Sequence, residues 1–314
     1  MNGTEPQIGV LKPFGEAFER MKLILFQPFD LGKWCVIGFA AWLARIGQGG
    51  FSFNYRYDQN TRLDQTPAWR GVSDAIHSIP FWLLIAGVSF LVIFVLGLVI
   101  LFAWLRGRGR FMFADCIVKN RAAIGEPWRE FRREGNSYFL FSLLIALAFL
   151  ILAALLFLPL LVPLIGGGKL SHFREAPVII MLVLWGLGMF LLGLAWALIA
   201  NLMIPIMYRR RCLAAEGFRA ALSLIAEYPG EITLYCLFWI LLGIGSLVVA
   251  CAAICLTCCI AALPYVGTVI LLPLYVCLRG FGLFFLRQFG PEYDVWATLA
   301  PLPAEPPAPP PLPA

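Results

Sequence analysis

The chain has 314 residues, of which 61% are hydrophobic and only 13% are charged. Its mean hydropathy is +0.84, whereas globular proteins contain about 45–50% apolar residues. Five long stretches hold a single charged residue between them, Arg279. These stretches are residues 79–105, 137–165, 177–207, 232–257 and 260–286. This composition excludes a soluble enzyme, a nucleic-acid-binding protein and a disordered chain, and it indicates an integral membrane protein.

Each of the five stretches can cross a membrane as a helix, because about 20 apolar residues span the hydrocarbon layer. The hydrophobic runs are continuous rather than alternating, which argues against a transmembrane barrel. We therefore predict an all-α polytopic helix bundle. A sixth span is expected at residues 31–53, where Lys33 and Arg45 can extend toward opposite interfaces.

The first 30 residues lack the apolar core of a signal peptide, so we expect no cleaved leader. Apolar residues recur there every three or four positions, which predicts an amphipathic helix lying on the bilayer surface. The alternative is a soluble helix packed on the bundle. The apolar positions are Leu11, Phe14, Phe18, Met21 and Leu25.

The C-terminal segment differs in kind from the rest of the chain. Residues 291–314 are rich in proline and carry no hydrophobic period, so we predict a disordered cytoplasmic tail of polyproline II character. A proline-recognising partner is the less favoured alternative for this tail. Residues 1–290 are expected to form one membrane domain.

Orientation follows from the distribution of Lys and Arg between alternate loops. With the N-terminus inside, 18 of the 24 Lys and Arg residues fall on the inner side. We therefore predict that both termini are cytoplasmic. Basic inner loops facing anionic headgroups also account for the net charge of +6 without any nucleic-acid partner.

A threefold internal repeat is suggested by the even-numbered spans, which end on Arg106, Arg209 and Arg279. A short amphipathic segment and a turn precede each odd-numbered span. The turns offer helix caps, namely Asp30 before the first span and Asn136 or Ser137 before the third. We predict a unit of one interfacial helix and one transmembrane hairpin, used three times. The alternative is that the ends of these spans resemble one another by chance, because arginine and glycine are common where a helix leaves the membrane.

Four cysteines cluster near the end of the fifth span, at Cys251, Cys255, Cys258 and Cys259. Three of them share a helical face, as metal ligands would, and oxidation is a further alternative. We favour simple packing because no histidine or acid lies nearby and cysteine is common in buried helices. No cofactor or metal is expected.

Other polar candidates are few. Asp74 and His77 in an outer loop could bind a metal or act as an acid–base pair, although a capping acid and an interfacial histidine explain them equally well. Asn201 is the strongly polar residue in the middle of the predicted span 177–207, and we expect it to hydrogen-bond across helices. No acid lies in the five stretches, which disfavours proton-coupled transport.

The end-of-span arginines are the lipid-headgroup candidates. Cations near the inner leaflet are attracted to anionic lipids, so we predict that Arg106, Arg209 and Arg279 form an inner collar. Arg279 is embedded among apolar residues and needs an acidic partner, either a lipid phosphate or a distant acid such as Glu126 or Glu227. The alternative is a snorkelling anchor without a specific partner.

The six helices, the interfacial helices, the three arginines and the segment Phe285–Gly290 resemble a broad group of uncharacterised bacterial membrane proteins. That group is similar to the membrane domain fused to glycerophosphoryl diester phosphodiesterases. The resemblance implies a multi-pass protein of the bacterial cytoplasmic membrane with unknown activity. It implies no hydrolase activity, because the catalytic barrel has no counterpart in this sequence.

The sequence thus favours a non-catalytic membrane module that binds lipid headgroups or partner proteins during envelope maintenance. A transporter or channel for a small neutral or anionic solute is the alternative, and a membrane-embedded enzyme is a third. Membrane lipids are the expected partners, with protein partners or self-association left open.

The predicted topology can be tested with single cysteines in a cysteine-free background. Substitutions Gly125→Cys and Gln59→Cys should be labelled from opposite sides of the membrane, because the two positions lie in an inner and an outer loop. The measurement is labelling of intact cells with an impermeant maleimide. Labelling of both positions from outside contradicts the six-span arrangement.

Overall fold

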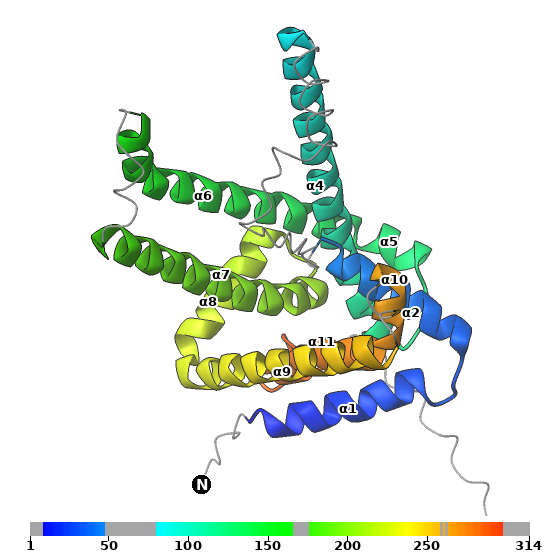
Figure 1. The fold of residues 1–314 in the computed structure, drawn as a ribbon. Helices are drawn as coiled ribbons and strands as arrows, with labels where there is room; N and C mark the ends of the chain where they lie inside the picture. The colour runs from blue at the N-terminus through cyan, green and yellow to red at the C-terminus, as the bar shows by residue number, and fades with distance from the viewer. Residues whose placement is uncertain (1–8, 48–79, 166–175, 258–259, 261–262, 298–314) are drawn as a thin grey trace, which may run out of the picture.

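The computed structural model describes residues 9–47, 80–165, 176–257, 260 and 263–297. Within these residues every regular element is a helix, which confirms the all-α fold class (Figure 1). Four of the described helices are long and apolar enough to cross a membrane.

The four long helices are α4 (Phe81–Val118), α6 (Arg132–Ile165), α7 (Ala176–Arg210) and α9 (Pro229–Leu256). They coincide with four of the predicted spans. Helix α4 continues well beyond its apolar stretch, because residues 106–118 remain helical and pack into the core. The apolar windows of α4, α7 and α9 are not buried inside the protein, as expected of surfaces that contact lipid.

The remaining helices are shorter: α1 (Leu11–Leu25), α2 (Leu31–Arg45), α5 (Gly125–Glu130), α8 (Ala214–Glu227), α10 (Pro264–Ile270) and α11 (Leu272–Arg287). Helix α2 has 15 residues, fewer than a full crossing needs. The stretch predicted as the sixth span, 260–286, is divided into α10 and α11 by a break at Leu271. The expected spans 31–53 and 260–286 are therefore not single long helices among the described residues.

The predicted helix caps have different outcomes. Asp30 caps α2 as expected, because its carboxylate accepts hydrogen bonds from the backbone N–H groups of Gly32 and Lys33. The prediction that Asn136 or Ser137 caps the third span is wrong, since α6 already begins at Arg132. Ser137 instead accepts a hydrogen bond from the backbone N–H of Ala214, at the start of α8.

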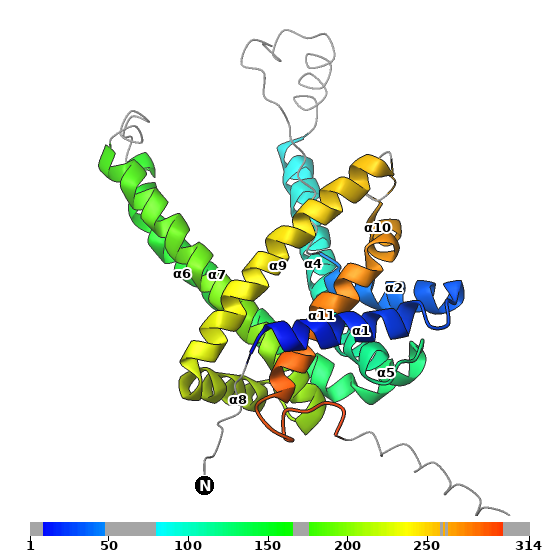
Figure 2. The same cartoon turned by 90° about the horizontal axis from the view of Figure 1, so that it is seen from below.

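The helices pack together at one end and diverge at the other. Figures 1 and 2 show α4 and the α6–α7 pair leaving the packed end in different directions. The core at the packed end is aromatic: the ring of Tyr235 stacks on those of Phe281 and Phe285, and all three side chains are fully buried. Arg20 and Arg211, which belong to the side predicted to be cytoplasmic, contact core residues at this packed end.

The peripheral helices α1, α5 and α8 each pack on a different partner: α1 on α11, α5 on α4, and α8 on α7. Helix α1 buries Ala17, Met21 and Leu25 but leaves Leu11 and Phe18 exposed. Part of the predicted apolar face thus contacts the bundle, and its location at the bilayer surface stays a prediction.

The packed part extends past residue 290, into the segment assigned to the tail. Val295 is fully buried, the ring of Trp296 stacks on Phe284, and Asp294 forms an ion pair with Arg287. Residues 298–314 lie outside the described residues.

Glycine allows α4 and α2 to approach closely. A Cβ atom added at Gly109 would lie 2.7 Å from the backbone of Leu43 and Ala44 in α2, closer than van der Waals contact allows. Gly280 has a similar role in α11, where a Cβ would lie 3.3 Å from the Cβ of Ala17 in α1.

The substitution Gly109→Ala should lower the free energy of unfolding by about 1–3 kcal/mol, because α2 must move away from α4. Gly97→Ala is the matched control, since nothing lies within 4 Å of its added Cβ and alanine favours a helix. Reversible denaturant unfolding in detergent micelles provides the measurement. Equal stability of the two variants would show that the close approach is unimportant.

Candidate anion-binding cavity

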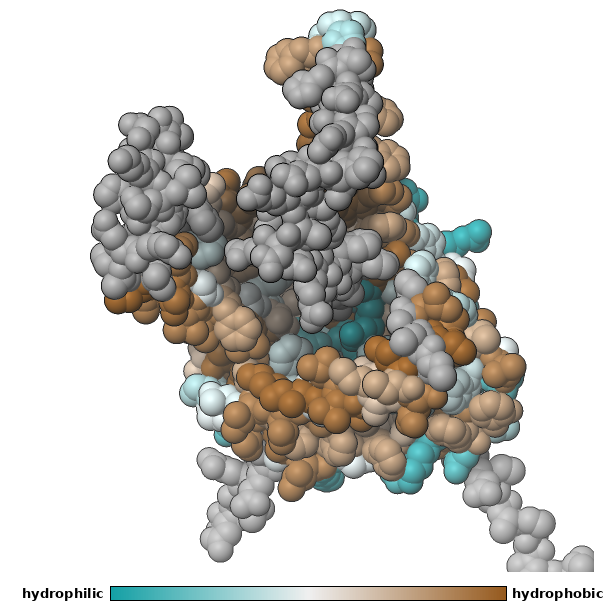
Figure 3. Space-filling model, in the orientation of Figure 1, coloured by the Kyte–Doolittle hydropathy of each residue, from teal (hydrophilic) through white to brown (hydrophobic). Residues whose placement is uncertain are grey.

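A cavity of about 610 Å³ lies where the helices converge. Side chains from α2, α4, α6, α7, α9 and α11 line it. Figure 3 shows hydrophilic surface inside the hollow between hydrophobic helices. The volume falls within the range of about 300–1,000 Å³ that is usual for small-molecule sites.

Four arginines line this cavity, and we call them the cavity arginines. Arg45 comes from the end of α2, Arg106 and Arg110 from successive turns of α4, and Arg279 from the middle of α11. Arg110 repels both Arg106 and Arg279 electrostatically. No aspartate or glutamate is among the lining residues that the structure describes.

The partners of the cavity arginines within the described part of the chain are neutral. Arg279 donates from Nη1 to Asn201 Oδ1 at 3.2 Å, while its Nη2 is buried without a hydrogen-bond partner. Arg110 donates to the hydroxyl of Tyr138. Arg45 lies over the ring of Tyr275, 4.1 Å from its centroid. Four cations thus line one cavity, and the described side chains that contact them there are neutral.

Asn201 makes the interhelical hydrogen bonds that its position in a span predicts. Its Oδ1 accepts from Arg279 in α11, and its Nδ2 lies 3.4 Å from the hydroxyl of Tyr235 in α9. Tyr235 is fixed by the aromatic core, so this chain of contacts fixes the orientation of the Arg279 guanidinium.

The structure brings together some of the predicted site residues but not all of them. Arg106, Arg279 and Asn201 share the cavity. Arg209 does not line it, and its Nε donates instead to the backbone oxygen of Pro291 at 3.4 Å. Glu126, suggested as a partner for Arg279, pairs with Arg121.

Two arginines of the cavity, Arg45 and Arg110, were not predicted from the sequence to be site residues. Arg110 follows Arg106 by four positions and therefore shares its helical face, a signal that could have been used. Arg45 had been assigned to the end of a span, and its place in the cavity, over the Tyr275 ring of α11, depends on how α2 packs against the other helices. Arg108, between Arg106 and Arg110 in sequence, faces away and lies between the rings of Trp104 and Trp128.

The other candidates lie elsewhere or outside the described residues. Cys251 and Cys255 are exposed free thiols near the end of α9, whereas Cys258 and Cys259 are outside the described part. Asp74 and His77 are also outside it. Among the residues that were described, no group of three or more potential metal ligands comes together.

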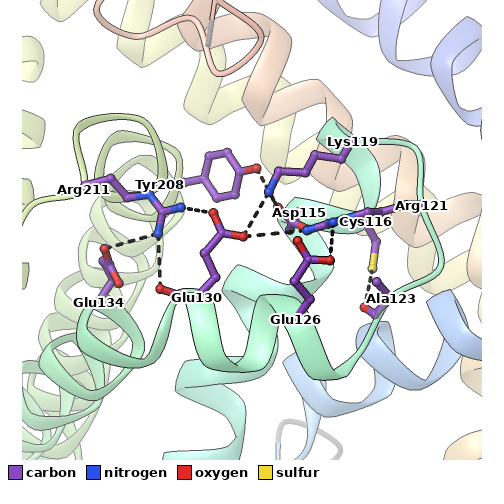
Figure 4. Close-up of polar contacts among 10 residues, drawn as sticks. All are labelled: Asp115, Cys116, Lys119, Arg121, Ala123, Glu126, Glu130, Glu134, Tyr208 and Arg211. Atoms are coloured by element: carbon purple, nitrogen blue, oxygen red, sulfur yellow. Dashed lines mark hydrogen bonds and ion pairs between the residues drawn. The ribbon is translucent and has the colours of Figure 1, made fainter. Parts of the chain in front are cut away.

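A second polar cluster surrounds Asp115 near the end of α4 (Figure 4). Its carboxylate is fully buried and accepts from the hydroxyl of Tyr208 at 2.9 Å. Lys119 Nζ lies 2.9 Å from one carboxylate oxygen, and Arg121 Nη2 lies 3.0 Å from the other. Each oxygen of Asp115 therefore faces a cation.

The cluster continues outward through glutamates that pair with the same cations. Glu126 accepts from Arg121 at 2.7 Å, and this hydrogen bond together with Asp115 raises the pKa of Arg121. Glu130 pairs with Lys119 and with Arg211, which follows the last residue of α7. The network joins α4, α5 and the end of α7, and its balanced charge indicates a structural role.

Asp115→Asn should destabilise the fold by on the order of 3 kcal/mol, because two cations and a tyrosine lose a buried anionic partner. Glu292→Gln is a suitable control, since it removes the exposed ion pair with Arg210 and should cost less than about 1 kcal/mol. Thermal and denaturant unfolding of the purified protein would measure both effects. A similar small loss in both variants would contradict the structural role of Asp115.

These features define a class: an all-helical protein with membrane-length apolar helices around a cationic cavity. Residues 10–296 match DUF7544, a family of unknown function, and the chain belongs to this family. No curated protein and no solved structure matches the chain. The resemblance to the membrane domain of glycerophosphoryl diester phosphodiesterases therefore stays a prediction.

Proposed function

We propose that this protein is a non-catalytic integral membrane protein that binds the phosphate of an anionic lipid headgroup in the cavity. The observation that carries the proposal is the set of four cavity arginines whose resolved side-chain contacts are all neutral. A charge removed from water is costly unless an opposite charge accompanies it. The ligand is the natural source of that opposite charge.

Phosphate suits the geometry of these side chains. A guanidinium presents several N–H donors in one plane, which match two oxygens of a phosphate. The Nη2 atom of Arg279 is buried with no acceptor among the described residues, so a phosphate oxygen at this point would satisfy it. Lysine would supply the charge without this geometry.

A lipid fits the surroundings of the cavity. Helices α4, α6 and α9, which line it, also carry exposed apolar side chains, along which acyl chains can lie. Trp196 and Trp239 line the cavity, and tryptophan favours the boundary between headgroups and hydrocarbon. The arginines lie toward the basic end of the bundle, which supports an inner-leaflet ligand and cytoplasmic termini in a bacterial cytoplasmic membrane.

The cavity lining also supports the proposed threefold repeat and six-span arrangement, in which α2 and the α10–α11 pair complete the first and third hairpins. Lining residues in equivalent helices are separated by constant intervals. Ser142, Ala146 and Phe149 in α6 correspond to Trp239, Gly243 and Ser246 in α9, and Ala197, Ala200 and Asn201 in α7 correspond to Tyr275, Leu278 and Arg279 in α11. In this register Asn201, rather than Arg209, is the counterpart of Arg279.

Transport of a small anion is the second candidate function. It is favoured by the position of the cavity among six helices and by the break between α10 and α11, because interrupted helices often form transporter sites. The two functions differ in the ligand that the arginines hold: a lipid that remains in the bilayer, or a soluble anion that passes through.

Removing Arg279 should reduce retention of anionic lipid. We expect Arg279→Gln to lose at least about tenfold in affinity for phosphatidylglycerol, the loss expected when charge-assisted hydrogen bonds are removed. Arg219→Gln is the matched control, since Arg219 is exposed on α8 and does not line the cavity. Native mass spectrometry from neutral detergent measures the bound lipid.

Thermal stability gives an independent measure of the same binding. Phosphatidylglycerol should stabilise the wild-type protein and the Arg219→Gln variant but not Arg279→Gln, because a ligand stabilises the state that binds it. Stabilisation of the wild type by inorganic phosphate alone, with none from the lipid, would favour the transporter. Equal lipid binding by the two variants would refute the cavity as the site.

A further inference from the structure

Three of the cavity arginines have a common neighbour, the side chain of Tyr138. Arg110 donates a hydrogen bond to its hydroxyl. Arg106 and Arg279 both interact electrostatically with Tyr138, and both also interact with Arg110. Helix α4 carries two of these arginines and packs against both α6, which carries Tyr138, and α11, which carries Arg279. We call Arg106, Arg110, Arg279 and Tyr138 the convergent cluster.

The convergent cluster has hydrogen-bond donors left for a ligand. Nη2 of Arg279 is buried with no acceptor among the described residues. Arg110 occupies an acceptor position of the Tyr138 hydroxyl, which leaves the O–H group of Tyr138 as a donor. The serines of the lining differ, because Ser142 and Ser246 donate to carbonyl groups of their own helices.

We infer that the ligand ends in a phosphomonoester, whose unesterified oxygens are bound by the convergent cluster. This inference rests on the proposed function and names the headgroup that the cavity selects: a terminal phosphate rather than a phosphodiester. It goes beyond a general attraction of anionic lipid to basic residues, because it depends on three guanidiniums and one hydroxyl being neighbours.

The number of oxygens and the charge both favour a phosphomonoester. It has three unesterified oxygens, one for each arginine of the convergent cluster, and it carries close to two negative charges above its second ionisation at about pH 6. A phosphodiester has two such oxygens and a single charge. Arg110 repels both Arg106 and Arg279, and a dianion among them offsets this repulsion better than a monoanion does.

The lining allows the charge of the ligand to be tested by pH. The volume of about 610 Å³ has room for either kind of headgroup, so selection depends on charge and donors rather than on size. The described lining contains no histidine, cysteine, aspartate or glutamate, the residue types whose titration could interfere between about pH 5 and pH 8. Its titratable side chains are the four cavity arginines, Tyr138 and Tyr275.

Two lipids with the same tails provide the direct test: phosphatidic acid, a phosphomonoester, and phosphatidylglycerol, a phosphodiester. The full-length protein in neutral detergent is titrated with each lipid, and native mass spectrometry measures the two dissociation constants. At about pH 8 we expect phosphatidic acid to bind about tenfold or more tightly, because its second charge strengthens the hydrogen bonds from the arginines. At about pH 5 the ratio should fall to about threefold or less, because the phosphate is then mostly a monoanion.

Variants link this preference to the convergent cluster. At about pH 8, Tyr138→Phe should reduce the ratio to about threefold or less, because the O–H donor is lost while the ring remains. Tyr228→Phe is the matched control and should keep the wild-type ratio, since Tyr228 precedes α9 and does not line the cavity.

Loss of an arginine should have the same effect as loss of the hydroxyl. Arg106→Gln should also reduce the ratio, whereas Arg219→Gln should not. A folding defect lowers the binding of both lipids in proportion and leaves their ratio unchanged, so the ratio reports on the convergent cluster itself.

The outcomes separate this inference from the proposed function. Equal affinity for the two lipids at both pH values, with both weakened by Arg279→Gln, would overturn the inference and leave headgroup binding intact. Lipid binding that is unaffected by Arg279→Gln would overturn both. A preference that survives Tyr138→Phe and Arg106→Gln would refute the convergent cluster as its source. Glycerol 3-phosphate that binds as tightly as phosphatidic acid would support a phosphomonoester site but refute a lipid as its ligand.

Discussion

Positive charge enclosed between membrane helices is the constraint on which the cavity depends. A guanidinium in a low-dielectric environment is tolerated only when its hydrogen bonds and its charge are both satisfied. Asn201 and Tyr138 accept hydrogen bonds from the cavity arginines and the ring of Tyr275 lies under Arg45, but none of the three supplies a negative charge. The same neutral partners hold the guanidiniums of Arg45, Arg110 and Arg279 in place, so the proposed site is formed without its ligand. Such preorganisation favours tight binding of an anion of matching geometry.

Two polar clusters on α4 illustrate the difference between a structural and a binding arrangement. Around Asp115, every cation has a carboxylate within ion-pair distance, and the network joins helices that are distant in sequence. Around Arg106 and Arg110, two turns earlier on the same helix, the described lining contains no carboxylate. Helix α4 therefore combines a closed ion-pair network at its end with a cationic cavity nearer its apolar stretch. The close contact of Gly109 with α2 lies between Arg106 and Arg110 and lets the two helices pack closely beside the cavity.

The sequence alone determined the fold class and most of the helix positions. Hydrophobic runs of membrane length predicted α4, α6, α7 and α9 because burial in lipid demands continuous apolar helices. The amphipathic period predicted α1, and the carboxylate before α2 predicted the cap at Asp30. These are local properties, set by residues a few positions apart. The pattern was less reliable where polar residues continue a helix, as at the start of α6, because tertiary packing rather than hydrophobicity keeps that segment helical.

The site was predicted only in part. Arg106, Arg279 and Asn201 were recognised because a polar residue in or beside an apolar span is conspicuous in any sequence. Arg45 and Arg110 were missed and Arg209 was included, because proximity to the end of a span does not reveal which way a side chain faces. An α-helix has 3.6 residues per turn, so side chains one position apart in sequence point in directions that differ by more than a quarter of a turn. A residue next to a cavity residue in sequence can therefore face away from the cavity. Which residues lie near a span could thus be read from the sequence, but which of them share the cavity was decided by how six helices cross.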